Sequence, residues 1–165
     1  MTLVAIPNET SPTDRRTAMS PANIAKLVQS GVDALVEEGL GVGSGFSDDQ
    51  YRQAGAVVTK NHEEIFSGGD VVLRIHKPTT EEAKLLKSGS VHVSYLDPFN
   101  EQELIETLKD RLVSTISMEM IPRTTRAQKM DALSSQASLA GYVMVLQAAN
   151  RLNRILPMMM TPSGT

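Results

Sequence analysis

Cysteine is absent from this sequence of 165 residues, and long apolar runs are absent too. Without cysteine the chain can form no disulfide, no thiolate metal site and no cysteine nucleophile. The lack of an uninterrupted apolar run of about 18 residues argues against a transmembrane helix. The first ten residues lack the basic and apolar regions of a secretory signal peptide. We therefore expect a soluble, cytoplasmic protein.

Strong charge of either sign is also missing. The formal net charge is −3 and no long basic run occurs, so we expect no nucleic-acid partner and no direct binding to an anionic membrane. The histidines, His62, His76 and His92, never stand at the spacing of metal ligands, so we predict no metal site. The 41% of hydrophobic residues is enough for one compact domain.

Short apolar runs alternate along the chain with segments of helical pattern. Helix starts are indicated by Ser20 before Pro21, by Ser47, by Thr79 with Glu82 three residues later, and by Asn100 with Glu103. The predicted strands are residues 3–6, 32–36, 57–58, 71–75, 91–96 and 112–116. Such alternation predicts an α/β fold with a doubly wound, mostly parallel sheet, Rossmann-like or flavodoxin-like.

A long helix is predicted after the last strand. Leu139, Val143 and Leu146 recur at helical spacing, and the pattern continues until Pro157. We expect this helix to span residues 134–156. The methionines at positions 158–160 that follow are more typical of an adaptable packing surface than of a metal site.

The glycines at positions 39, 41, 43 and 45 lie between a predicted strand and a predicted helix. Their spacing does not fit the GxGxxG pattern of dinucleotide-binding loops. The following helix opens with Asp48 and Asp49, whose negative charges disfavour a pyrophosphate. We interpret this run as a turn before a helix with an acidic N-terminus.

Polar residues are concentrated in the loop before the long helix. Arg123, Arg126, Gln128, Asp131 and Ser134 together offer charged donors, an amide, a carboxylate and a hydroxyl. These groups suit a carboxamide ring, a ribose or a phosphate, so the loop is a candidate ligand-binding face. The alternative is a solvated loop that caps a helix beginning near Asp131 or Ser134.

The stretch IPRTTRAQKMDALSSQASLAGY closely resembles the signature of the NAD(H)-binding α subunit of proton-translocating NAD(P) transhydrogenase, in the alanine dehydrogenase/transhydrogenase family. It departs from that signature at Thr124, Thr125 and Lys129. The resemblance implies that NAD(H) is the cofactor and that NADP(H) is bound by a partner subunit. It assigns cofactor binding to Arg123, Gln128, Asp131 and Ser134, and catalytic roles to Gln128 and Asp131, with Gln128 reaching toward the partner's nucleotide.

Alanine dehydrogenases resemble the chain as well, including an arginine that matches Arg16. They carry a catalytic lysine where this sequence has His76, and a catalytic histidine where it has Asp97. Both replacements argue for the transhydrogenase. His76 and Lys77 remain candidate site residues on position alone, since they end a predicted parallel strand. An alanine dehydrogenase-like fragment remains an alternative.

The resemblance also implies a domain plan. Residues 1–133 would form the α/β N-terminal domain, residues 134–156 a connecting helix, and residues 157–165 a tail leading to a nucleotide-binding domain that this sequence does not contain. We expect the chain to be inactive alone, to form a homodimer, and to pair with a transhydrogenase β subunit or other NADP(H)-binding component. Membrane association would occur only through these partners. A non-enzymatic interaction module is the alternative.

Overall fold

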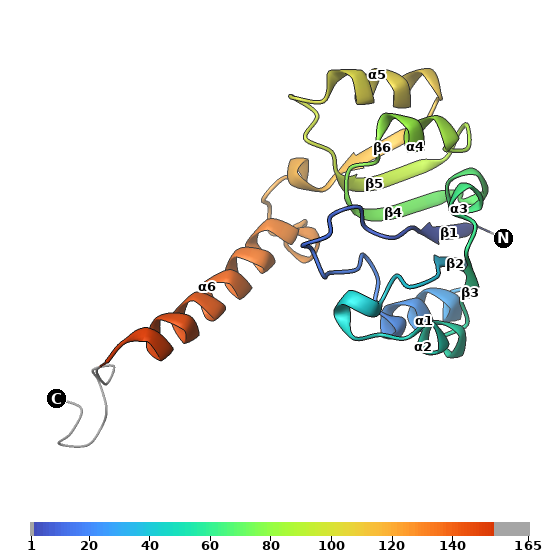
Figure 1. Ribbon diagram of the computed structural model, residues 1–165. Helices are drawn as coiled ribbons and strands as arrows, with labels where there is room; N and C mark the ends of the chain where they lie inside the picture. The colour runs from blue at the N-terminus through green and yellow to red at the C-terminus, as the bar shows by residue number, and fades with distance from the viewer. Residues whose placement is uncertain (1, 154–165) are drawn as a thin grey trace. The chain divides into compact units, whose positions relative to one another are not determined.

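The computed structural model describes residues 2–153, which fall into two compact units that divide after Met120 (Figure 1). The first unit, Met1–Met120, contains a parallel sheet flanked by helices. Its strands are β1 (Leu3–Ile6), β2 (Asp33–Glu37), β3 (Val57–Thr59), β4 (Val71–His76), β5 (Val91–Tyr95) and β6 (Ser114–Ser117). Its helices are α1 (Pro21–Gln29), α2 (Asp48–Gln53), α3 (His62–Gly68), α4 (Thr80–Leu85) and α5 (Gln102–Asp110), with short 3-10 turns η1 (Val42–Ser44) and η2 (Met118–Met120).

The sheet has the order β3-β2-β1-β4-β5-β6, and each neighbouring pair is parallel. This confirms the predicted doubly wound α/β fold, and each predicted strand has its counterpart in the sheet. The chain reverses its direction of strand addition between β1 and β4. Ligands of open α/β sheets bind outside the carboxyl ends of the strands at such a switch point.

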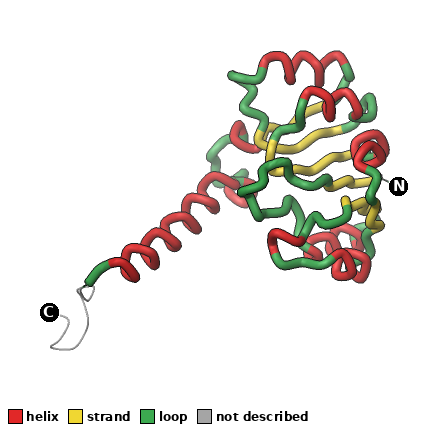
Figure 2. The backbone as a smooth tube through the Cα atoms, in the orientation of Figure 1, coloured by secondary structure: helices red, strands yellow, loops and turns green. Residues whose placement is uncertain are grey.

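Helices cover both faces of the sheet, as the tube view shows (Figure 2). One apolar cluster joins the sheet to α3, α4 and α5 and contains Phe66, Val72 and Leu108. The other joins it to α1 and α2 and contains Ile24 and Tyr51. Alternate residues of β1 and β2 contribute to opposite clusters, because successive side chains of a strand point to opposite faces. Packing on both faces fixes the strand register and so holds the carboxyl edge in place.

Two predicted helix caps are confirmed and one is wrong. Ser47 and Thr79 both form capping boxes with the residue three positions later. Asn100 does not cap α5: its side-chain amide donates to Asp97 instead, and Glu101 occupies the N-cap position without a side-chain hydrogen bond. The reason is the sharp end of β5, where Asp97 takes a left-handed conformation with φ 51° and turns its carboxylate toward Asn100.

The second unit, as far as it is described, contains a short 3-10 turn η3 (Gln128–Met130) and the long helix α6 (Ala132–Arg151). The helix begins two residues earlier than predicted, because Asp131 rather than Ser134 is its N-cap. It also ends before residue 156, since Leu152 has an extended backbone with ψ 126°. The predicted tail, with Pro157 and the three methionines, lies outside the described residues. Within residues 2–153, no helix is long and apolar enough to cross a membrane.

Candidate functional site

The predicted site loop lies in the second unit, where the structure joins two of its four candidate residues directly. Asp131 accepts two hydrogen bonds from Ser134: its Oδ1 is 2.9 Å from the backbone nitrogen and its Oδ2 is 2.6 Å from Oγ. The hydrogen bond from the Ser134 hydroxyl lowers the pKa of Asp131, helped by the Ser134 backbone N–H and by the positive charge of Arg123. Asp131 is therefore a fixed, ionised carboxylate at the start of α6.

The other two candidates, Arg123 and Gln128, are exposed. Neither side chain forms a hydrogen bond with another residue of the described part of the chain, and Gln128 begins the 3-10 turn that leads into α6. The loop thus combines a capping interaction with open donors. Both interpretations made from the sequence apply at once: Asp131 and Ser134 cap the helix, and Arg123 and Gln128 retain their full capacity to bind a ligand.

A separate cleft of about 650 Å³ lies at the carboxyl ends of β4 and β5 in the first unit. Its lining includes His76, Lys77, Thr79, Tyr95, Asp97 and Glu101. The ammonium group of Lys77 lies 2.6 Å from the Glu101 carboxylate and 3.8 Å from that of Asp97. His76 and Lys77 are thus at a cleft, as their position in the sequence indicated, but the charge of Lys77 is already neutralised.

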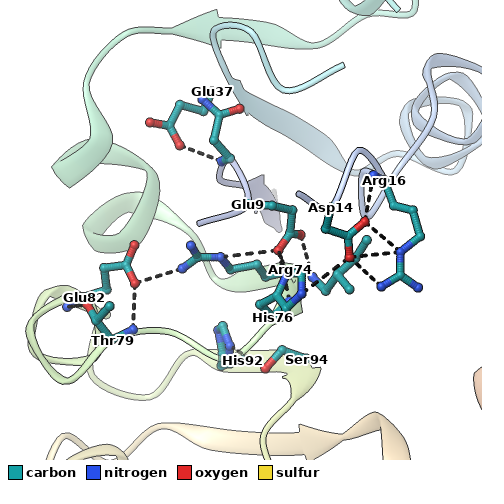
Figure 3. Close-up of polar contacts among 12 residues, drawn as sticks. Glu9, Asp14, Arg16, Glu37, Arg74, His76, Thr79, Glu82, His92 and Ser94 are labelled. Atoms are coloured by element: carbon teal, nitrogen blue, oxygen red, sulfur yellow. Dashed lines mark hydrogen bonds and ion pairs between the residues drawn. The ribbon is translucent and has the colours of Figure 1, made fainter. Parts of the chain in front are cut away.

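His76 is held by two acidic residues from the segment after β1 (Figure 3). The Glu9 carboxylate accepts the backbone N–H groups of Ile75 and His76 at 2.7 and 3.0 Å, and lies 2.9 Å from His76 Nδ1. The other ring nitrogen of His76 is 3.4 Å from the carboxylate of Asp14. Glu9 therefore ties β1 to β4 at the switch point of the sheet.

Arg74 occupies the centre of the same region, with its side chain fully buried (Figure 3). Its Nη1 is 2.9 Å from Glu82 and its Nε is 3.8 Å from Glu9, while the guanidinium lies 6.0 Å from the centre of the Phe66 ring. Burial alone would raise the pKa of Glu82, but hydrogen bonds from Thr79 and Arg74, with the charge of Arg74, lower it overall. Arg74 and Glu82 therefore form a buried ion pair beneath the carboxyl edge.

Two further links extend these contacts into one continuous row. His62, the first residue of α3, lies 2.9 Å from Glu37 and 3.2 Å from Glu82 through its two ring nitrogens. At the far end Asp14 binds Arg16, and this hydrogen bond holds the pKa of Asp14 at about 2. We call the row the carboxyl-edge network; its members in order are Glu37, His62, Glu82, Arg74, Glu9, His76, Asp14 and Arg16.

Sequence reasoning missed most of this network. A single signal was available, namely Arg74 inside the otherwise apolar run VVLRI, which a buried parallel strand tolerates only when the charge is paired. Its partners could not be found from spacing, because Glu9 and Ile75 are 66 positions apart in the chain.

The glycine run also acquires a structural explanation. A Cβ atom at Gly43 would lie 3.0 Å from the carbonyl oxygen of Arg15, and one at Gly41 would lie 2.6 Å from Cβ of Phe46. Ser44 Oγ donates a hydrogen bond of 2.6 Å to the same Arg15 carbonyl. These glycines therefore allow the loop to pack closely against its own helix and against the segment that carries Arg15 and Arg16.

Comparison with known proteins places these features in a family context. Residues 5–140 match the family model described as alanine dehydrogenase/PNT, N-terminal domain. The chain is 40% identical to an NAD(P) transhydrogenase subunit alpha of Rhodospirillum rubrum, over 98% of this chain and 44% of that protein. A crystal structure of transhydrogenase from Sinorhizobium meliloti superposes with a TM-score of 0.86 and 41% identity, over 98% of this chain and 48% of that one.

Similarity to alanine dehydrogenases is lower. The enzyme of Bacillus subtilis is 29% identical over 84% of this chain and 36% of its own length. The chain spans less than half the length of each of these relatives. The comparisons therefore cover the N-terminal part of longer proteins.

Proposed function

Because the chain belongs to the family of alanine dehydrogenase/PNT N-terminal domains, we propose that it is the N-terminal part of the NAD(H)-side component of a proton-translocating NAD(P)+ transhydrogenase. It would form one wall of the cleft in which hydride passes from NADH to NADP+. The observation that carries this proposal is the loop at the start of α6, where an ionised carboxylate, fixed by Ser134, shares a short loop with the exposed donors of Arg123 and Gln128.

The loop residues fit a nicotinamide nucleotide. The amide and guanidinium donors of Gln128 and Arg123 match the carboxamide oxygen of nicotinamide, and the Asp131 carboxylate can accept hydrogen bonds from ribose hydroxyls. The nucleotides themselves supply the hydride chemistry when bound. The chain's contribution is to orient NAD(H), with Gln128 extended toward NADP(H) on the partner, because correct alignment of two reactants lowers the barrier without any protein nucleophile.

The first unit favours this proposal over an alanine dehydrogenase. At position 76 the chain has a histidine engaged by Glu9 and Asp14, and at position 97 an aspartate whose Oδ1 accepts a hydrogen bond from Asn100. The nearby Lys77 ammonium is bound by Glu101. Because carboxylates neutralise these cations, a 2-oxo acid substrate would meet paired rather than free positive charge at the described lining of the cleft.

We propose two kinds of partner. A second copy of the chain would cover the apolar side chains of α6, of which Leu139, Val143 and Leu146 are about half exposed. A transhydrogenase β subunit or other NADP(H)-binding component would supply the second nucleotide and the attachment to the membrane. The chain itself would remain on the cytoplasmic side, as its sequence indicates.

The exposed apolar surface of α6 also supports a second candidate function, a non-enzymatic interaction module. Reconstitution separates the two. The chain would be supplied with the nucleotide-binding domain of a relative and with the NADP(H)-binding component, and reduction of NADP+ by NADH would be followed optically. The transhydrogenase proposal predicts turnover that requires every component. If all components are folded and assembled but no hydride is transferred, the interaction module is the better description.

A further inference from the structure

The two partly exposed histidines of the carboxyl-edge network each lie between two carboxylates. His62 Nδ1 is 2.9 Å from Glu37 and Nε2 is 3.2 Å from Glu82. His76 Nδ1 is 2.9 Å from Glu9 and Nε2 is 3.4 Å from Asp14. Both imidazoles therefore use both of their ring nitrogens on acidic partners, whose side chains are themselves no more than 13% exposed.

Hydrogen-bond chemistry restricts the protonation state that suits this geometry. An ionised carboxylate only accepts hydrogen bonds, and a neutral imidazole has one N–H donor and one acceptor nitrogen. A neutral ring between two carboxylates therefore satisfies one of them and turns a lone pair toward the other. Only the imidazolium, with two N–H groups, donates to both.

The charges of the network agree with this conclusion. It contains the carboxylates of Glu9, Asp14, Glu37 and Glu82, and only two permanent cations, Arg16 and Arg74. With both imidazoles neutral, the row carries two uncompensated negative charges at the edge of a buried region. Two imidazolium ions balance it.

The surroundings of each ring contain few other charges. Beyond its two carboxylates, His76 adjoins Lys77, which is bound by Glu101, and lies on the same strand as the buried Arg74. His62 packs on the ring of Phe66 in its own helix. Lys60, which precedes the helix, pairs with Glu38 instead. Each histidine therefore responds mainly to the network.

We infer that His62 and His76 form a proton-operated clasp across the carboxyl edge of the sheet. In the protonated form His62 joins β2 to α4, and His76 joins the segment of residues 9–16 to β4. On losing its proton, His76 keeps the shorter contact to Glu9 and releases Asp14, which retains Arg16. The segment 10–16 then moves away from β4, and because Thr10 and His76 both line the 650 Å³ cleft, the cleft widens.

The ring nitrogens of the unmodified chain provide the direct test. Long-range ¹H–¹⁵N spectra distinguish a doubly protonated ring from either neutral tautomer, and they would be recorded from about pH 5 to pH 8, the range in which histidine ordinarily changes charge. The clasp predicts two protonated nitrogens in both His62 and His76 at the acid end, and a single Nδ1–H tautomer of His76 at the alkaline end. A neutral ring at either position across the whole range would overturn the inference.

Variants test the movement of the segment. In the parent chain the amide signals of residues 10–16 should shift with the same midpoint as the His76 ring, and their order parameters should fall as pH rises. His76→Gln, and separately Asp14→Asn, should abolish this response, whereas Lys77→Gln is the matched control and should preserve it. Retention of the response in both His76→Gln and Asp14→Asn would refute the clasp; unchanged sheet signals in the spectra confirm that each variant is folded.

Discussion

Arg74 and Glu82 lie 2.9 Å apart beneath the carboxyl edge of the sheet, and both residues are less than 10% exposed. Glu82 also receives the backbone N–H of Thr79, so the same carboxylate caps α4 and neutralises a buried strand residue. This double use connects the start of a helix to the interior of the sheet. It makes the pair a structural element of the candidate site region.

Replacing Arg74 by Met should therefore destabilise the fold strongly. The change leaves Glu82 and Glu9 without their buried cation, and breaking one side of a buried ion pair typically costs about 3–5 kcal/mol. Urea unfolding at neutral pH measures the loss. The matched control is Lys84→Met, which breaks the exposed pair between Lys84 and Glu81 and should cost less than about 1 kcal/mol. Equal losses in the two variants would contradict the structural role of Arg74.

His92 should make the fold sensitive to acid. Burial, helped by the charge of Arg74, lowers the pKa of this fully buried histidine to about 4, so the folded chain keeps the ring neutral. In the unfolded chain the ring is protonated below about pH 6.5. The stabilising contribution is therefore complete above about pH 6.5 and disappears as pH falls toward 4, a loss of about 3 kcal/mol.

Comparison with His92→Leu isolates this effect. The free energy of unfolding of both chains would be measured at about pH 7 and about pH 4.5, where the native ring is still largely neutral. The parent should lose more stability than the variant between the two conditions. An identical pH dependence in the two chains would show that His92 is not responsible.

Asp131 has two roles that one substitution can separate. Asn is as good an N-cap as Asp, so Asp131→Asn should leave the start of α6 intact, whereas Asp131→Ala should unwind its first turn. Only the carboxylate charge differs between the parent and Asp131→Asn. Backbone chemical shifts of residues 132–135 report the helix, and NADH affinity in the reconstituted enzyme reports the charge. Full affinity in Asp131→Asn would remove the carboxylate from the proposed ribose contacts.

How far the sequence predicts this molecule depends on the distance over which a feature is determined. The capping box of Thr79 and Glu82 was predicted because its partners are three residues apart. The strands were found from their apolar runs, since burial on both sides of a parallel sheet is recorded locally. The network around Arg74 was not predicted, because its members come together only when β1 and β4 are placed side by side.

The candidate loop shows the same limit from the other direction. Its residues were selected by resemblance, and the structure adds that Asp131 and Ser134 are bonded while Arg123 and Gln128 stay open to solvent. The end of α6 was overestimated because the apolar spacing of Leu139 and Val143 continues past Arg151, although the helix does not. Apolar periodicity therefore indicates which residues can share a face, without fixing where the backbone stops being helical.

Arg123→Ala should weaken NADH binding in the reconstituted enzyme. The substitution removes a charged planar donor, and loss of one charge-assisted hydrogen bond typically lowers affinity about ten- to a hundredfold. Fluorescence titration with NADH measures the effect. Lys129→Ala, which removes another exposed cation of the same loop, is the control and should bind NADH like the parent. A similar loss in both variants would indicate a general effect of charge.

The central claim is that the loop before α6 orients nucleotides for hydride transfer, and single-turnover transfer from NADH to NADP+ in the reconstituted enzyme tests it most directly. Gln128→Ala would be compared with Lys129→Ala at saturating nucleotide. If Gln128 reaches the partner's nucleotide, its loss should slow transfer about tenfold or more while NADH affinity changes less. Parent-like transfer by Gln128→Ala, with both nucleotides bound, would contradict the claim.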